Sequence, residues 1–256
     1  MNVDATISIY EIIATVLAFF ALVQPWIIKW WMHYFKPLKI SFIRPKKISL
    51  FYNKSGSYVY IDGVIESKNR SIVVRDIEVK IVRDNNKTEL NLDWSTFRAP
   101  VFQQIGNNSV VTNEIAHPFV IAKDTLIPVY TEFALANQDD VDQLECVYNE
   151  MATLTMRLVE SISNYDQVKA ELEASDVYKR NREKLLENFY WKEGKYYMDL
   201  VITYNDDNKK TFRFCFELNG HDSARLKANI EKALLIDLNM KFGKAISLNT
   251  LQKEIY

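Results

Sequence analysis

An uninterrupted apolar run near the N-terminus constrains this chain more than any other feature. Residues 12–23 carry no charge and a single hydroxyl group, and an apolar triplet at 26–28 continues the run beyond Pro25. From Ile9 to Ile28 the run has about 20 residues, which at ~1.5 Å per residue matches the ~30 Å hydrocarbon core of a bilayer. The sequence therefore predicts one transmembrane helix joined to a larger soluble part.

Three other interpretations of the run fit less well. A cleaved signal peptide has a basic start, whereas here Asp4 and Glu11 precede the first basic residue, Lys29. A buried helix of a soluble protein has a polar face, and residues 12–23 have none. An in-plane amphipathic helix fails on the same point, although residues 26–36 could lie in the membrane interface beyond a proline kink.

Aromatic and basic residues follow at the point where the run would leave the hydrocarbon core. Tryptophan and tyrosine concentrate at headgroup depth, and lysines are enriched on the cytoplasmic side. Each basic residue close to an anionic leaflet adds ~1 kcal/mol of attraction, so this segment, through Lys47, either sets topology alone or also contacts lipid. The residues expected at the membrane interface are Trp26, Lys29, Trp30, Trp31, Tyr34, Lys36 and Lys39.

The charge distribution predicts an orientation. No acidic residue lies between Glu11 and Asp62, whereas seven basic residues do, all of them after the run. The positive-inside rule then places the N-terminus outside and the soluble part in the cytoplasm, at the inner face of the cell membrane. Cys146 and Cys215 fit this compartment as two reduced thiols, since two cysteines do not form the disulfide framework of a small secreted domain.

The region from 37 to 137 has the pattern of β-strands. Apolar residues alternate with polar ones at Val59–Ile65 and again at Ile77–Ile81, as half-buried strands require. Further strands are expected at 89–94, 109–111, 117–122 and 125–135. Short strands with no helix between them predict an antiparallel β-sandwich, Ig-like in the broad sense.

Helical periodicity replaces this pattern at 138–190. An apolar stripe from Val141 to Ile162, capped at Asp139 or Asp140, predicts a first helix, and 166–189 predicts a more charged second one. The two would form a helical hairpin inserted in the β region. The stripe could pack inside the monomer or pair subunits as a coiled coil.

Strands return at 191–256, the last part of the chain. Alternation at 196–204 and 212–218, around the turn at 205–208, predicts a β-hairpin. A helix capped near Asp222 or Ser223 follows it, and 247–255 is interpreted as a short helix. The expected fold is mainly β with α additions, divided into an anchor (1–36) and a sandwich domain (37–256).

The sequence contains no motif of a catalytic, cofactor or metal site. His33, His117 and His221 have no ligand partner at metal-binding spacing, and six glycines in the chain leave no phosphate-cradling loop. Loop carboxylates at Asp139–Asp142 and Asp206–Asp207 could hold calcium, but they fit a helix start and a hairpin turn better. We therefore expect no enzyme activity, no cofactor and no metal.

Composition also limits the classes of molecule that the chain is expected to bind. Thirty-two basic and 33 acidic residues give a net charge of −1, which does not favour nucleic acid. The aromatic and basic strings at 41–45 and 191–197 are interpreted as strand residues of the core. The expected partners are the lipid bilayer and a protein partner or a second copy of the chain; a small-molecule ligand is left open.

Three classes of function remain. The first is a membrane-tethered binding or scaffold protein, because the chain combines an anchor and a packed domain with no chemistry, an architecture also found among bacterial proteins. The second is an oligomeric transmembrane effector that forms a pore or disrupts the bilayer. The third is an enzyme with scattered catalytic residues, which a pocket with converging carboxylates or histidines would support.

Overall fold

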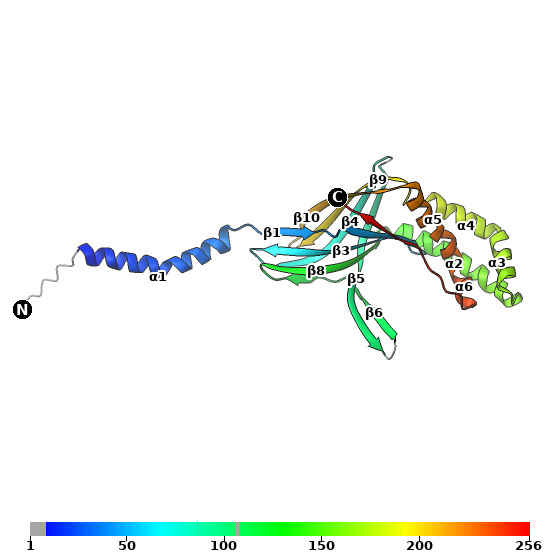
Figure 1. Cartoon of the computed structure of the whole chain (residues 1–256), viewed down its shortest axis with the longest axis horizontal. Coiled ribbons are helices and arrows are strands. Elements are labelled where there is room, and N and C mark those ends of the chain that lie inside the picture. The colour runs from blue at the N-terminus through cyan, green and yellow to red at the C-terminus, as the bar shows by residue number, and fades with distance from the viewer. Residues whose placement is uncertain (1–8, 86, 106–107) are drawn as a thin grey trace, which may run out of the picture.

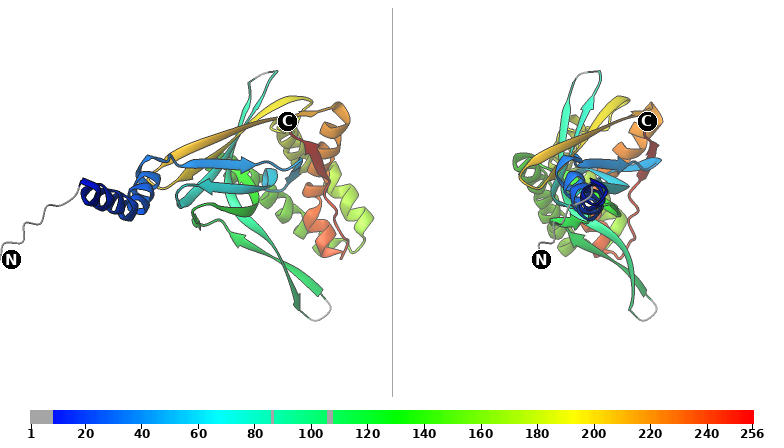
Figure 2. Two further views of the ribbon diagram at one scale, coloured as in Figure 1. Left: turned by 60° about the vertical axis from the view of Figure 1, so that its left-hand side comes forward. Right: turned by 90° about the vertical axis from the view of Figure 1, so that its left-hand side faces the viewer.

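Three parts of the molecule follow one another along its long axis. The computed structural model describes residues 9–85, 87–105 and 108–256. Helix α1 (Ile9–Phe35) leaves one end of a curled β-sheet, and the other helices cover the opposite end (Figure 1). The views in Figure 2 show the same arrangement and a long β-hairpin that projects from the side of the sheet. The fold is therefore mixed α/β.

A single sheet contains all the strands among the described residues. The strand order is β10-β9-β4-β5-β8-β3-β2-β11, with β1 also paired to β3, β6 to β5 and β7 to β4, and every pair is antiparallel. The strands are β1 (Lys39–Ile43), β2 (Lys47–Asn53), β3 (Gly56–Lys68), β4 (Ile72–Arg83), β5 (Glu89–Ile105), β6 (Asn108–Ile115), β7 (Phe119–Ile121), β8 (Thr125–Leu135), β9 (Gly194–Tyr204), β10 (Asn208–Leu218) and β11 (Thr250–Glu254).

The sandwich expected from the sequence is not confirmed, because the sheet is a half-barrel. Alternation correctly marked strands with one buried face, but that face looks across a curled sheet and not onto a second sheet. The pairing of β4 with β9 across the helical insertion is the reason, since it joins the two β regions into one surface. No Ig-like arrangement results.

The helices at the far end differ in detail from the expected hairpin. They are α2 (Gln138–Ser161), α3 (Tyr165–Ala174), α4 (Asp176–Glu187), α5 (Gly220–Leu234) and α6 (Ile236–Lys241). The expected second helix is two helices, because Ser175 ends α3 and its side chain caps α4. The apolar stripe of α2 is buried inside the monomer at Val147, Tyr148, Met151 and Thr155. This stripe is therefore not available as a coiled-coil seam.

Asparagines cap three of the helices, and at α2 and α5 they replace the aspartate or serine caps that the sequence predicts. Asn137 caps α2, accepting a bond from the Asp139 N–H, and Asn219 caps α5. At α5 the caps are reciprocal, because Asp222 also accepts from the Asn219 N–H. Residues 247–255 do not form the short helix expected, since β11 occupies 250–254 as an edge strand beside β2.

The C-terminal segment holds the curl of the half-barrel. Tyr256 exchanges two backbone hydrogen bonds with Cys215 of β10, at 2.9 and 3.1 Å, so the two ends of the sheet meet there. Lys253 of β11 lies 2.7 Å from the Asp222 carboxylate at the start of α5. The Asn229 side chain of α5 donates to the backbone oxygens of Tyr52 and Asn249. The β11 edge of the sheet and helix α5 therefore stabilise each other.

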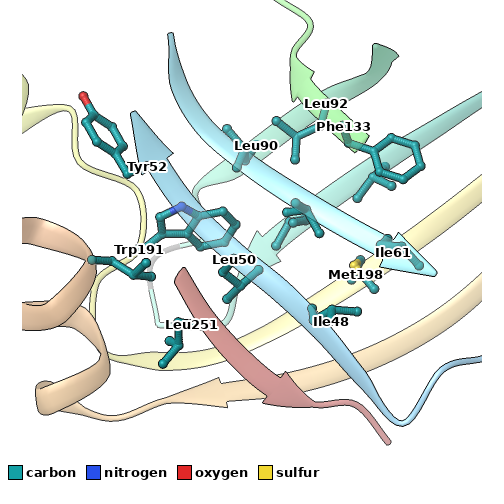
Figure 3. Packing of buried hydrophobic residues seen from close by; sticks show 14 of the residues in the cluster. Ile48, Leu50, Tyr52, Ile61, Leu90, Leu92, Phe133, Trp191, Met198 and Leu251 are labelled. Atoms are coloured by element: carbon teal, nitrogen blue, oxygen red, sulfur yellow. The ribbon is translucent and has the colours of Figure 1, made fainter. Parts of the chain in front are cut away.

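A tryptophan from the loop between α4 and β9 fills the concave side of the sheet. Trp191 is fully buried and lies beside Leu50 of β2 (Figure 3). Its indole N–H donates to the backbone oxygen of Phe51 at 3.3 Å. Tyr196 stacks on Phe216 beside it, with ring centroids 5.0 Å apart. Trp191 thereby joins the helical insertion to strands from both halves of the chain.

We predict that Trp191→Ala destabilises the domain by about 3–5 kcal/mol, because it opens a large cavity and leaves the Phe51 carbonyl without its donor. Urea unfolding of the detergent-solubilised protein, followed by circular dichroism, measures the change. Trp30→Ala, at an exposed ring on α1, is the control and should shift the transition by less than about 0.5 kcal/mol. A similar small shift for Trp191→Ala would contradict the assigned role.

Candidate membrane interface and helix–sheet pocket

Helix α1 exposes its whole apolar surface. The stretch Ile9–Trp31 has 23 residues and a mean hydropathy of 1.9, and none of its most apolar window is buried against the rest of the protein. Leu17, Phe19 and Leu22 are 63%, 64% and 74% exposed. Such a helix is about 35 Å long at ~1.5 Å per residue, which is long enough to cross a bilayer with some tilt. By length and composition, α1 is a candidate membrane span.

The helix continues through Pro25 to Phe35, so the aromatic segment extends the same helix. Trp30 lies 5.2 Å from Tyr34 and Trp31 stacks on Phe35 at 4.3 Å, both pairs at the i, i+4 spacing of neighbours on one helix face. Trp26 stands one turn before Trp30 and is 76% exposed. The aromatic residues expected at the interface thus form two adjacent stripes on a single helix end.

The expected basic residues occupy different elements. Lys29 is exposed on α1, Lys36 follows the end of the helix, and Lys39 opens β1 opposite Lys68 of β3. Lys46 and Lys47 lie farther from α1. Ser49, two residues after Lys47 in β2, pairs with Tyr60, which is in the half of β3 that is farther from α1. At ~3.3 Å per residue this places them roughly 20 Å from the α1 end. Within the basic segment 29–47, only the residues up to Lys39 lie beside the helix.

A pocket lies at the opposite end of the half-barrel, between the sheet and α2 and α4. It holds about 400 Å³. Its apolar wall is made by Leu90, Leu135, Leu144, Val147 and Leu185, and its polar groups include Tyr52, Glu89, Asp140, Lys184 and Asn188. Apolar walls with a few polar groups are typical of small-molecule sites. Sequence reasoning missed it because α2, α4 and four strands contribute residues from separate parts of the chain.

The tyrosines beside this pocket are held neutral. Burial raises the pKa of Tyr52 to about 12, against a lowering contribution from Tyr148. The pKa of Tyr148 is also raised above its usual range, by burial first and by the neighbouring Tyr52 second. Burial likewise raises the pKa of Tyr190, whose hydroxyl donates to the Ile81 backbone oxygen at 2.8 Å. These phenols line the pocket or lie beside it as polar groups without charge.

His117 and His221, the two histidines whose side chains the structure describes, lie on separate elements. The His33 side chain lies outside what the structure describes, His117 contacts the Ile115 backbone oxygen at 3.0 Å through Nδ1, and His221 is exposed in the first turn of α5. Among the described residues no group of three His, Cys, Asp or Glu side chains could hold a metal ion. Asp140 lines the pocket and Asp139 lies in the first turn of α2, whereas Asp206 and Asp207 form ion pairs with Arg75.

No protein-family model matches the chain, and no curated protein matches it in sequence.

We predict that Tyr52→Phe flattens the loss of stability at high pH. The folded state raises the pKa of Tyr52 from 10.0 to about 12, so its contribution is complete below pH 10 and is lost as the pH rises through 12. Between these values the wild type should lose about 2 kcal/mol more than the variant. Urea midpoints at pH 9, 10, 11 and 12 measure this, and parallel losses would show that Tyr52 ionises freely in the folded state.

Proposed function

We propose that the chain is a single-pass membrane protein that presents its half-barrel as a binding module at the inner face of the membrane, without catalytic activity. The observation that carries the proposal is the free surface of α1. Leaving an apolar helix of this size in water would be costly, since apolar surface is worth ~25 cal/mol per Å² on transfer out of water. Among the described residues nothing covers the helix, so a bilayer is its natural solvent.

The proposed orientation rests on the charges beside α1. Lys29, Lys36 and Lys39 flank the C-terminal end of the span, whereas Glu11 lies in its first turn. The positive-inside rule places the lysine end in the cytoplasm. The rest of the chain would then stand on the cytoplasmic side, with the pocket at the end farther from the bilayer.

Binding is proposed for the pocket and for the surface of the helical end. A space of about 400 Å³ between α2, α4 and the sheet suits a small, mainly apolar ligand with one or two polar groups. Of the two carboxylates that line the pocket, Glu89 is paired with Lys80 at 2.7 Å and Asp140 lies in the first turn of α2. A tethered module needs no chemistry of its own, since it acts by concentrating a partner at the membrane.

Assembly into a pore receives less support. The α2 stripe that could have joined subunits is buried in the monomer, so assembly would depend on α1 alone. Size measurement in detergent at micromolar protein distinguishes the two functions. A monomer supports the binding module, and a defined oligomer that also conducts ions across a bilayer would favour the effector.

We predict that Leu17→Arg together with Phe20→Arg prevents membrane insertion. Both positions lie near the middle of Ile9–Trp31, where each arginine costs roughly 3 kcal/mol. Alkaline extraction followed by flotation on a density gradient should recover the wild type with the lipid and the variant elsewhere.

The control for this variant carries the same two charges at the helix end. Ile9→Arg together with Tyr10→Arg should still float with lipid, because side chains there reach the headgroups. Release of the wild-type chain by alkaline extraction would overturn the proposed membrane span.

A further inference from the structure

The end of the half-barrel from which α1 leaves is a surface in its own right. Two loops meet there beside the helix exit: the β3–β4 loop (69–71) and the β7–β8 loop (122–124). The Asn69 N–H donates to the Asp124 carboxylate at 2.8 Å, and the Lys123 N–H donates to the Ser71 hydroxyl at 3.0 Å. The loops therefore form one ledge, which we call the exit ledge.

The exit ledge is joined to the end of α1. The Asn69 side chain donates to the Pro37 backbone oxygen at 2.8 Å, just beyond the helix. The Arg70 guanidinium donates to the Tyr34 backbone oxygen at 3.5 Å. These bonds hold the ledge close to the aromatic end of the span, so a bilayer crossed by α1 would reach it first.

Basic residues from three separate segments gather at this end. Lys36 and Lys39 follow α1, Lys68 and Arg70 flank the β3–β4 turn, and Lys123 lies in the other loop. The acidic residues nearby are Glu66, which pairs with Lys68 at 2.9 Å, and Asp124, within 3.9 Å of Lys123. Five basic against two acidic residues leave the ledge and the helix exit positive, although net charge over the chain is −1.

The next turn along the edge carries charges of both signs. Asp206 and Asp207 lie in the β9–β10 turn, which Asn205 ties to Val73 of β4. Arg75 is 3.9 and 3.5 Å from these two carboxylates. Lys209 pairs with Glu78 at 3.7 Å, so acidic and basic side chains are paired with each other at this turn, whereas the exit ledge has an excess of basic residues.

Exposed apolar side chains accompany the charges. Val120 of β7 is 61% exposed and stands opposite Val73 of β4, which is also exposed, and Leu126 of β8 is 56% exposed next to the second loop. Apolar side chains beside lysines are typical of surfaces that lie in a membrane interface. Packing within the domain explains neither the excess of basic residues nor the exposed apolar side chains at this end.

We propose that the exit ledge is a second membrane contact, which binds anionic lipid headgroups through Lys68, Arg70 and Lys123 and inserts Val120 and Leu126 at headgroup depth. The proposal rests on the membrane span proposed for α1, which fixes the ledge beside the leaflet. Each basic residue near an anionic leaflet favours contact roughly fivefold, so three together favour the docked state on the order of 100-fold. The domain is thus held in one orientation, with its pocket turned to the cytoplasm.

The test uses the full chain in nanodiscs made from zwitterionic lipid alone, or with about one anionic lipid in three. A fluorophore is attached at Val120→Cys in a chain that also carries Cys146→Ser and Cys215→Ser, and a quencher is attached to the lipid headgroups. A separate Cys215→Ser chain, labelled on the native Cys146 of the helical end, reports a site far from the ledge. Strong quenching at position 120 in anionic discs only, with little at Cys146, is the expected result.

Charge variants make the test specific. Lys68→Gln, Arg70→Gln and Lys123→Gln together should abolish the anionic-lipid effect at position 120. Lys179→Gln, Lys227→Gln and Lys241→Gln remove the same charge from the helical end and should change nothing. Unchanged thermal unfolding of both variants shows that folding is intact.

The experiment distinguishes a failure of the proposed function from a failure of the exit-ledge proposal. Protein that does not copurify with either nanodisc would contradict the span of α1 and with it the proposed function. Protein that copurifies but shows equal quenching at both labels, or no dependence on anionic lipid, would overturn the exit-ledge proposal alone.

Discussion

The curl of the sheet depends on filling its concave face. A half-barrel has a single inner face, so no second sheet supplies the opposite wall of its core. Trp191 provides much of this wall and ties to β2 through its hydrogen bond to Phe51. The adjacent stack of Tyr196 on Phe216 is a cross-strand pair that adds to this wall on β9 and β10. Without these large side chains, the concave face would lack the packing that stabilises the curl of the sheet toward Tyr256.

This closure also sets the two ends of the molecule apart. Lys68 and the β3–β4 loop stand at one end of β3, and Gly56, beside the pocket, stands at the other. Strand β3 has 13 residues and so spans roughly 40 Å at ~3.3 Å per residue. A chain inserted through α1 would therefore keep its exit ledge at the lipid surface and its pocket well into the aqueous phase. Anchoring and binding would use separate ends of one rigid sheet.

Local features were predictable from the sequence because short-range periodicity determines them. The strand expected at 125–135 matches β8, the hairpin around 205–208 is confirmed as β9 and β10, and the apolar run is the helix α1. Each has an unbroken pattern over many residues, and the turn at Asn205 and Asp207 uses residues that tolerate positive φ. These local sequence patterns do not depend on residues that are far away in the sequence.

Features that depend on long-range pairing were not predictable. The buried set of β4 changes register at a bulge between Val74 and Asp76, so that Ile72 and Ile77 both face inward. Strand β11 takes its conformation from β2, about 200 residues earlier, which is why helical periodicity misled there. Lys68, Arg70 and Lys123 gave no signal either, because only the folded sheet brings them beside the end of α1.

The side of the membrane on which the half-barrel stands is tested most directly by labelling Cys146, an exposed thiol at the helical end. Intact cells expressing the Cys215→Ser chain are treated with a membrane-impermeant maleimide before and after permeabilisation. The account predicts labelling only after permeabilisation, and the reverse for a cysteine introduced at Asn2 with Cys146 removed. Labelling of Cys146 in intact cells would contradict the proposed cytoplasmic module.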